Sequence, residues 1–65
     1  MKKLSDMSIG DRGLVLYLPF DFYDSRIRRF AELKVILNIF GNVLIKTEYG
    51  IKFIGKETAS LITCE

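Results

Sequence analysis

The residues that come closest to a chemical site are acidic ones in the first half of the chain. Asp21 and Asp24 are near enough in sequence for their carboxylates to share a cation through oxygen ligands. The same residues are good helix N-caps, because a carboxylate accepts hydrogen bonds from the free N–H groups of a first helical turn. We favour capping, and we expect neither a metal site nor a cofactor.

Nucleophilic and acid–base catalysis have little to build on in this chain. The sequence contains no histidine, which is the usual general base. Its single cysteine, Cys64, lies at the chain end without a basic neighbour, so we expect no lowered thiol pKa. A soft-ligand iron site would need more Cys or His than the chain contains. The sequence therefore favours a protein that is not an enzyme.

Basic residues gather in one short stretch. Arg26, Arg28 and Arg29 are followed closely by Lys34, and arginine binds the phosphates of nucleic acids well. Acidic residues interleave with them, and the formal net charge is only +2. We therefore favour a solvated basic surface. A small nucleic-acid-binding barrel that uses these residues is kept as the alternative.

Exposed aromatic residues are the other candidate for a contact surface. A chain of 65 residues, of which 49% are hydrophobic, has too little interior to bury them all. Exposed apolar patches usually mark a partner surface. Phe20 and Phe22, beside Pro19, are the aromatic residues that we expect to be exposed, with packing over a barrel end as the other interpretation. Together with Arg26 and Arg29, they are the residues predicted to contact a partner.

Length and composition indicate one small domain that spans residues 1–65. With one cysteine the chain forms no internal disulfide, which is typical of proteins in the reducing cytosol. The first residues carry positive charge but no apolar core of signal-peptide length. No apolar run approaches the ~20 residues of a membrane span. We therefore expect a cytoplasmic protein without direct membrane insertion.

The elements that would position these residues begin with a strand. The apolar run Gly13–Leu18 ends at a proline, which lacks a backbone donor and so ends a hydrogen-bond ladder. Residues 21–33 then follow a helical period, with apolar side chains at i, i+4, i+7 and i+8 from Tyr23. Asp24 and Arg28 would form an i, i+4 ion pair on this helix.

Two strands of a hairpin follow the predicted helix. Residues 34–40 form one strand and residues 43–48 the other. Gly41-Asn42 between them fits a two-residue turn of type II′, which prefers glycine first. This register places Phe40 opposite Val43. One face of the hairpin would then contain the side chains of Ile36, Phe40, Val43, Ile45 and Thr47.

The last part of the chain completes the predicted sheet. Residues 51–54 indicate a further strand, and residues 55–60 a single helical turn with Ala59 and Leu61 pointing inward. Residues 61–64 would form a closing strand. This order predicts a mainly β protein: a small β-barrel of about five strands, with one short α-helix between the first and second strands.

Three segments carry a family resemblance. Leu4-Ser5-Asp6-Met7, followed by Gly10-Asp11, is similar to the opening of the FeoA family. Arg28–Leu33 looks like the family's helix, and Ile51–Ile62 resembles its closing signature, with an Ala in the short turn. Over most of its length the chain therefore resembles the FeoA family, whose members are small cytoplasmic accessory proteins of bacterial ferrous iron transport.

Two features depart from the family pattern. Lys34 stands where the family usually has Gly after its helix. The family's longer stretch between helix and strands is reduced here to Gly41-Asn42. If that stretch carries a partner contact in the relatives, this chain lacks it.

The resemblance implies an SH3-like barrel that works as a non-enzymatic interaction module. It would modulate a membrane ferrous iron transporter (FeoB-like) from the cytoplasmic side, with the transporter's GTP-binding cytoplasmic domain as partner. The resemblance implies a role in iron homeostasis and a link to transition metal ion binding. The residues themselves leave open whether a metal ion contacts the chain. A homo-oligomer that buries its own surplus strand surface is a further alternative.

Overall fold

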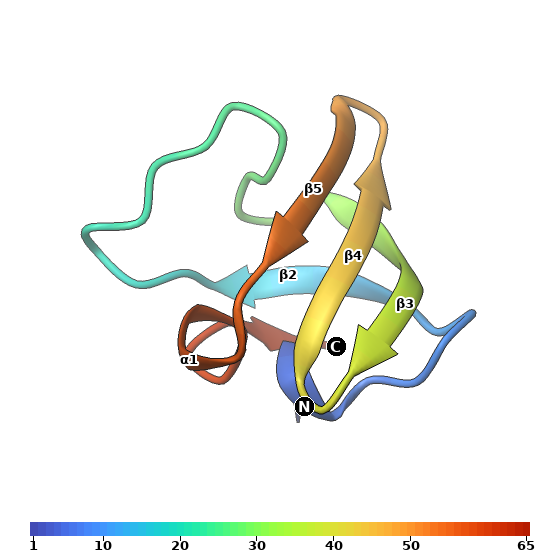
Figure 1. Ribbon diagram of the computed structural model, residues 1–65. Helices are drawn as coiled ribbons and strands as arrows, with labels where there is room; N and C mark the ends of the chain where they lie inside the picture. The colour runs from blue at the N-terminus through green and yellow to red at the C-terminus, as the bar shows by residue number, and fades with distance from the viewer.

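The computed structural model describes residues 1–65, and six strands form one antiparallel sheet in the order β1-β6-β2-β3-β4-β5 (Figure 1). The predicted mainly β architecture is confirmed. β1 and β5 are the two edges, so the curled sheet is open, and it has six strands rather than about five. The elements are β1 (Lys2–Lys3), the 3-10 helix η1 (Leu4–Asp6), β2 (Arg12–Tyr17), β3 (Glu32–Ile39), β4 (Asn42–Thr47), β5 (Gly50–Ile54), α1 (Lys56–Ala59) and β6 (Thr63–Cys64).

The predicted α-helix between the first and second strands is wrong. Residues 18–31 form a loop with isolated turns, and the segment Arg28–Leu33 runs from this loop into β3. A helix so short depends on burying one apolar face. Tyr23 is fully exposed here, and Phe30 has a left-handed φ of 68°, which interrupts any helix. The α-helix of the structure is α1, which is too short to cross a membrane.

The β3–β4 hairpin turns one residue earlier than expected. Ile39 lies opposite Asn42, so the turn residues are Phe40 and Gly41. Their φ values of 53° and 90° are both positive, which defines a type I′ turn, and the predicted type II′ register is wrong. Asn42 is the first residue of β4 and not a turn residue. Its Oδ1 accepts a hydrogen bond of 2.8 Å from the backbone N–H of Lys56 at the start of α1.

A β-bulge decides which side chains of β3 face the core. The pairing with β4 shifts between Val35 and Leu37, so Ile36 is the extra residue. Leu33 and Val35, before the bulge, face the core, whereas Ile36 is half-buried and Phe40 is 90% exposed. The prediction that Ile36 and Phe40 share one face with Val43 and Ile45 is therefore wrong. The prediction for β4 is confirmed, since its buried side chains are those of Val43, Ile45 and Thr47.

The C-terminal elements close the core. The helical turn expected at residues 55–60 is confirmed as α1, and Ala59 is fully buried as predicted. Leu61 was expected to point inward but is 63% exposed, because the turn after α1 places Ile62 in the core instead. The core contains twelve buried side chains: Leu4, Met7, Val15, Ile27, Leu33, Val35, Val43, Ile45, Ile54, Ala59, Ile62 and Cys64.

Candidate functional site

The loop of residues 18–31 connects β2 to β3 and contains all the residues predicted to contact a partner. It extends away from the sheet at the upper left of Figure 1. The loop is held by specific side-chain bonds at one point and exposes large aromatic side chains at others. These two kinds of residue therefore have different roles.

Asp24 and Arg26 hold the loop in shape. The Asp24 carboxylate accepts hydrogen bonds from the Arg26 backbone N–H at 2.8 Å, from its Nε at 3.0 Å and from its Nη2 at 2.9 Å. Lys52 of β5 places its Nζ 3.3 Å from the same carboxylate. The hydrogen bonds from Arg26 hold the pKa of Asp24 well below its ordinary value. The expected ion pair with Arg28 is not formed, because Arg26 and Lys52 occupy the carboxylate.

Arg26 also fastens the loop to the β4–β5 hairpin. Its Nη1 donates a 2.9 Å hydrogen bond to the carbonyl oxygen of Ile51, and its own carbonyl oxygen accepts one from the Thr47 hydroxyl. A Cβ atom on Gly50 would lie 3.3 Å from the Arg26 Cδ, so the side chain lies directly on the hairpin. The Arg26 guanidinium therefore positions the loop, and 40% of its side chain stays exposed.

The two phenylalanines at the start of the loop differ in their surroundings. Phe20 is fully exposed, as expected. Phe22 packs against the hydrophobic core, which is the other interpretation that its sequence position allowed. It also lines two hollows, of about 350 Å³ beside Tyr23 and about 260 Å³ beside Leu61. Phe22 thus supports a segment in which the aromatic side chains of Phe20 and Tyr23 are fully exposed.

Arg29 lies in a second aromatic group at the base of the loop. Its Nε donates a 2.9 Å hydrogen bond to the carbonyl oxygen of Leu16. Its guanidinium carbon is 5.5 Å from the centre of the Tyr17 ring and 4.9 Å from that of Phe30. Both rings are more than half exposed, and Phe30 has positive φ, which is unfavourable for a bulky residue. Strained, exposed residues of this kind are typical of recognition surfaces.

We group the exposed aromatic side chains of the loop, the exposed Tyr17 at the end of β2 and Arg29 as one set. The set is named the aromatic loop surface and comprises Tyr17, Phe20, Tyr23, Arg29 and Phe30. The helical period concealed part of this set, because it placed Tyr23 and Phe30 on one shared apolar face of a predicted helix. The signal for the loop is Asp24, since an Asp side chain that binds the N–H two residues later forms a turn that competes with a helix.

The basic cluster expected as a nucleic-acid surface is separated by the fold. The Arg26 guanidinium is paired with Asp24, and that of Arg28 lies 4.4 Å from the centre of the Tyr49 ring. Lys34 lies on β3, where it pairs with Arg12 and Lys46 of the neighbouring strands. The sequence neighbours therefore do not form a continuous track of the kind that follows a nucleic-acid backbone.

Reactive side chains are few and far apart in this fold. Cys64 is buried in the core, and desolvation by burial raises the pKa of its thiol to about 11. Such a thiol is largely inert, which agrees with a structural role. No three or more His, Cys, Asp or Glu side chains lie close enough together to hold a metal ion. Asp21 and Asp24 accordingly do not form part of such a group.

Comparison with known proteins supports the fold assignment. No protein-family model matches the chain, and no curated protein matches it. The crystal structure of an iron uptake regulatory protein, FeoA, superposes on it with a TM-score of 0.79 at 20% sequence identity. The match covers 98% of this chain and 95% of that chain. The chain therefore has the small SH3-like β fold of the FeoA protein.

Proposed function

We propose that this protein is a FeoA-type accessory protein of ferrous iron uptake. The fold match carries the proposal, since it extends over 98% of the chain with a TM-score of 0.79. The resemblance of the opening and closing segments to the FeoA family supports it independently from the sequence. In this role the protein acts by binding another protein and catalyses no reaction of its own.

The proposed partner is the GTP-binding cytoplasmic domain of a FeoB-like membrane transporter. The protein binds that domain from the cytoplasm, without entering the membrane, and modulates the transport of ferrous iron. A protein that acts by binding another protein needs a surface that stays exposed in the folded chain. The many exposed aromatic side chains of this chain support such a surface.

The aromatic loop surface is the proposed contact. Aromatic and arginine side chains are the residues that most often dominate binding free energy in protein interfaces. We propose that Phe20 and Arg29 contact the partner directly; the full exposure of Phe20 and the position of Arg29 against two exposed rings support this. Phe22 and Arg26 support the loop from beneath and contribute their exposed parts to the contact.

Calorimetric titration of the purified transporter domain into the full chain tests this proposal. We expect the wild-type chain to bind and the Phe20→Ala variant to bind about tenfold more weakly. Phe20 has no packing to lose, so the variant keeps its stability. Ile9→Ala removes another exposed apolar side chain, at a turn outside the loop, and should leave the affinity unchanged. Absence of binding at high micromolar concentration, with normal iron uptake in a deletion strain, would overturn the proposal.

A further inference from the structure

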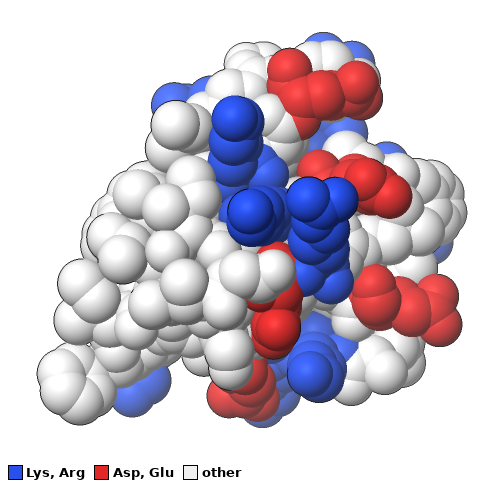
Figure 2. All heavy atoms as spheres, turned by 90° about the vertical axis from the view of Figure 1, so that its right-hand side faces the viewer, with Lys and Arg blue, Asp and Glu red and all other residues white.

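The outer face of the sheet, on the side away from the core, carries charged and apolar residues in separate zones. β2, β3, β4 and β5 contribute to it, and its side chains are largely exposed. Figure 2 views the molecule from the right-hand side of Figure 1. It shows Lys and Arg side chains gathered at the centre of that side, next to a wide area without charged groups.

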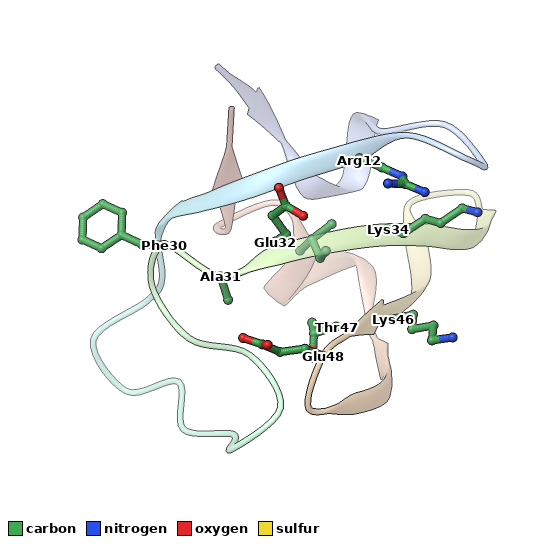
Figure 3. A pocket seen from close by; sticks show the side chains of 9 residues that line it. Arg12, Phe30, Ala31, Glu32, Lys34, Lys46, Thr47 and Glu48 are labelled. Carbon is green, nitrogen blue, oxygen red and sulfur yellow. The ribbon is translucent and has the colours of Figure 1, made fainter.

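A row of three basic residues crosses this face. Arg12 lies opposite Lys34, and Lys34 lies opposite Lys46, on three adjacent strands. Neighbouring strands are about 4.8 Å apart, so the whole row spans about 10 Å. Figure 3 shows the three side chains pointing to the same side of the sheet. This set is named the basic row.

No acidic side chain forms an ion pair with the basic row. Both ion pairs of the structure belong to Asp24, in the distant loop. Glu32 and Glu48 line the same groove of about 620 Å³, but neither forms an ion pair. Like charges directly opposite each other across strands destabilise a sheet. The three charges of the basic row therefore have no ion-pair partner within the fold.

A row of apolar residues lies beside the basic row on the same face. Leu37 lies opposite Leu44, and Leu44 lies opposite Phe53, across β3, β4 and β5. Leu37 is 43% exposed and Phe53 is 58% exposed. This set is named the apolar row. On β4, Lys46 and Leu44 are two residues apart, so the two rows are about 7 Å from each other.

We propose that this face binds a protein segment in which carboxylate side chains lie about 7 Å from apolar side chains. The carboxylates would neutralise the basic row, and the apolar side chains would cover the apolar row. Residues i and i+2 of a strand, or i and i+4 of a helix, have the required spacing. The inference rests on the proposed function, because it identifies a second surface by which an interaction module holds its protein partner.

Charge complementarity favours a protein segment over a nucleic acid. A nucleic-acid backbone needs basic residues along its whole path. Here Glu32 and Glu48 border the basic row on one side, and the apolar row borders it on the other. The basic row, about 10 Å long, can pair with one or two anionic groups. A phosphate chain that continued past it would lie on the apolar row, where it would find no basic side chain. A mixed acidic and apolar segment matches both rows at once.

NMR titration of the isotope-labelled full chain with a blocked synthetic peptide tests the inference. The probe peptide carries Glu and Leu in turn at every second position, with Ser between them, so that both lie on one face of a strand. Its control replaces every Glu by Gln. We expect the Glu peptide to shift the amide signals of Lys34, Leu44 and Lys46, and the Gln peptide to bind about tenfold more weakly. Equal affinity for the two peptides, or shifts confined to the 18–31 loop, would overturn the inference.

Charge-reversal variants separate this face from non-specific attraction. Lys34→Glu should weaken binding of the Glu peptide about tenfold. Lys3→Glu changes the net charge equally but lies on β1, opposite Thr63, and should leave the affinity within about twofold. Thermal unfolding of each variant checks that it is folded. Equal weakening by both variants would contradict the inference. So would a single-stranded oligonucleotide that shifts the same amide signals and binds more tightly than the Glu peptide.

The transporter domain distinguishes this inference from the proposed function. If the domain binds and Phe20→Ala weakens binding while Lys34→Glu and Phe53→Ser do not, the inference fails and the proposed function stands. If the domain does not bind but the Glu peptide still binds through Lys34, the proposed function fails and the inference stands. If sedimentation shows a dimer that Phe53→Ser abolishes, the occupant is a second copy and the inference is overturned.

Discussion

The carboxylate of Asp24 and the guanidinium of Arg26 form an ion pair with a shortest distance of 2.9 Å, and this pair organises the segment between β2 and β3. Because the two residues are so close in sequence, the pair closes a tight turn where a helix would keep both side chains apart. Arg26 then reaches Ile51 on β5, so a local turn is joined to the sheet. The loop keeps its aromatic side chains exposed as a result.

Removal of the Asp24 carboxylate should loosen this loop. Asp24→Ala leaves Arg26 and Lys52 without their acceptor, and we expect the melting temperature to fall by about 5 °C. The partial exposure of Arg26 limits the effect. Differential scanning calorimetry measures it, with Asp21→Ala as the control, because Asp21 is an exposed acid of the same loop without a hydrogen bond. Equal melting temperatures for the two variants would refute this account.

The same carboxylate should make the stability depend on pH in the acidic range. The pKa of Asp24 is lower in the folded chain than its ordinary value of 3.8. Its contribution to stability is therefore complete above that value and is lost as the pH falls toward the lower folded pKa. The difference in unfolding free energy between wild type and Asp24→Asn should shrink from about pH 5 to about pH 2. Urea titrations measure this difference, and a constant value would show that Asp24 is not responsible.

The β3–β4 turn should gain stability from a residue that prefers its conformation. Phe40 has a φ of 53° and is 90% exposed, so it loses little packing when replaced. Phe40→Asn creates the Asn-Gly pair favoured in type I′ turns, and we expect a gain of about 1 kcal/mol in unfolding free energy. Chemical denaturation measures the gain. Phe40→Leu keeps an unfavourable residue at this position and should show none.

The basic row should cost stability in the absence of a partner. Lys34→Gln removes the central charge and should raise the unfolding free energy by about 0.5 kcal/mol at low salt. At about 1 M salt the gain should vanish, because screening already weakens the repulsion between the lysines. Lys3→Gln, outside the row, is the matched control. A gain that persists at high salt would point to a cause other than repulsion.

Several elements of the fold could be predicted because they depend on neighbours in sequence. The strand Arg12–Tyr17, the two strands around residue 41 and the turn Lys56–Ala59 all follow from short apolar runs and glycine positions. The mainly β class follows from the order of these elements in the same way. Prediction failed where two local signals competed, because the helical period of residues 21–33 concealed the turn that Asp24 forms.

Local sequence thus determined which segments form strands and, to within a residue or two, where the turns between them lie. Tertiary structure alone decided the bulge at Ile36, the exposure of Phe30 and Phe40, and the alignment of Arg12, Lys34 and Lys46. The reason is that strand register depends on contacts between segments far apart in the chain, and a shift of one residue moves every following side chain to the other face. The surfaces proposed for binding arise from that register.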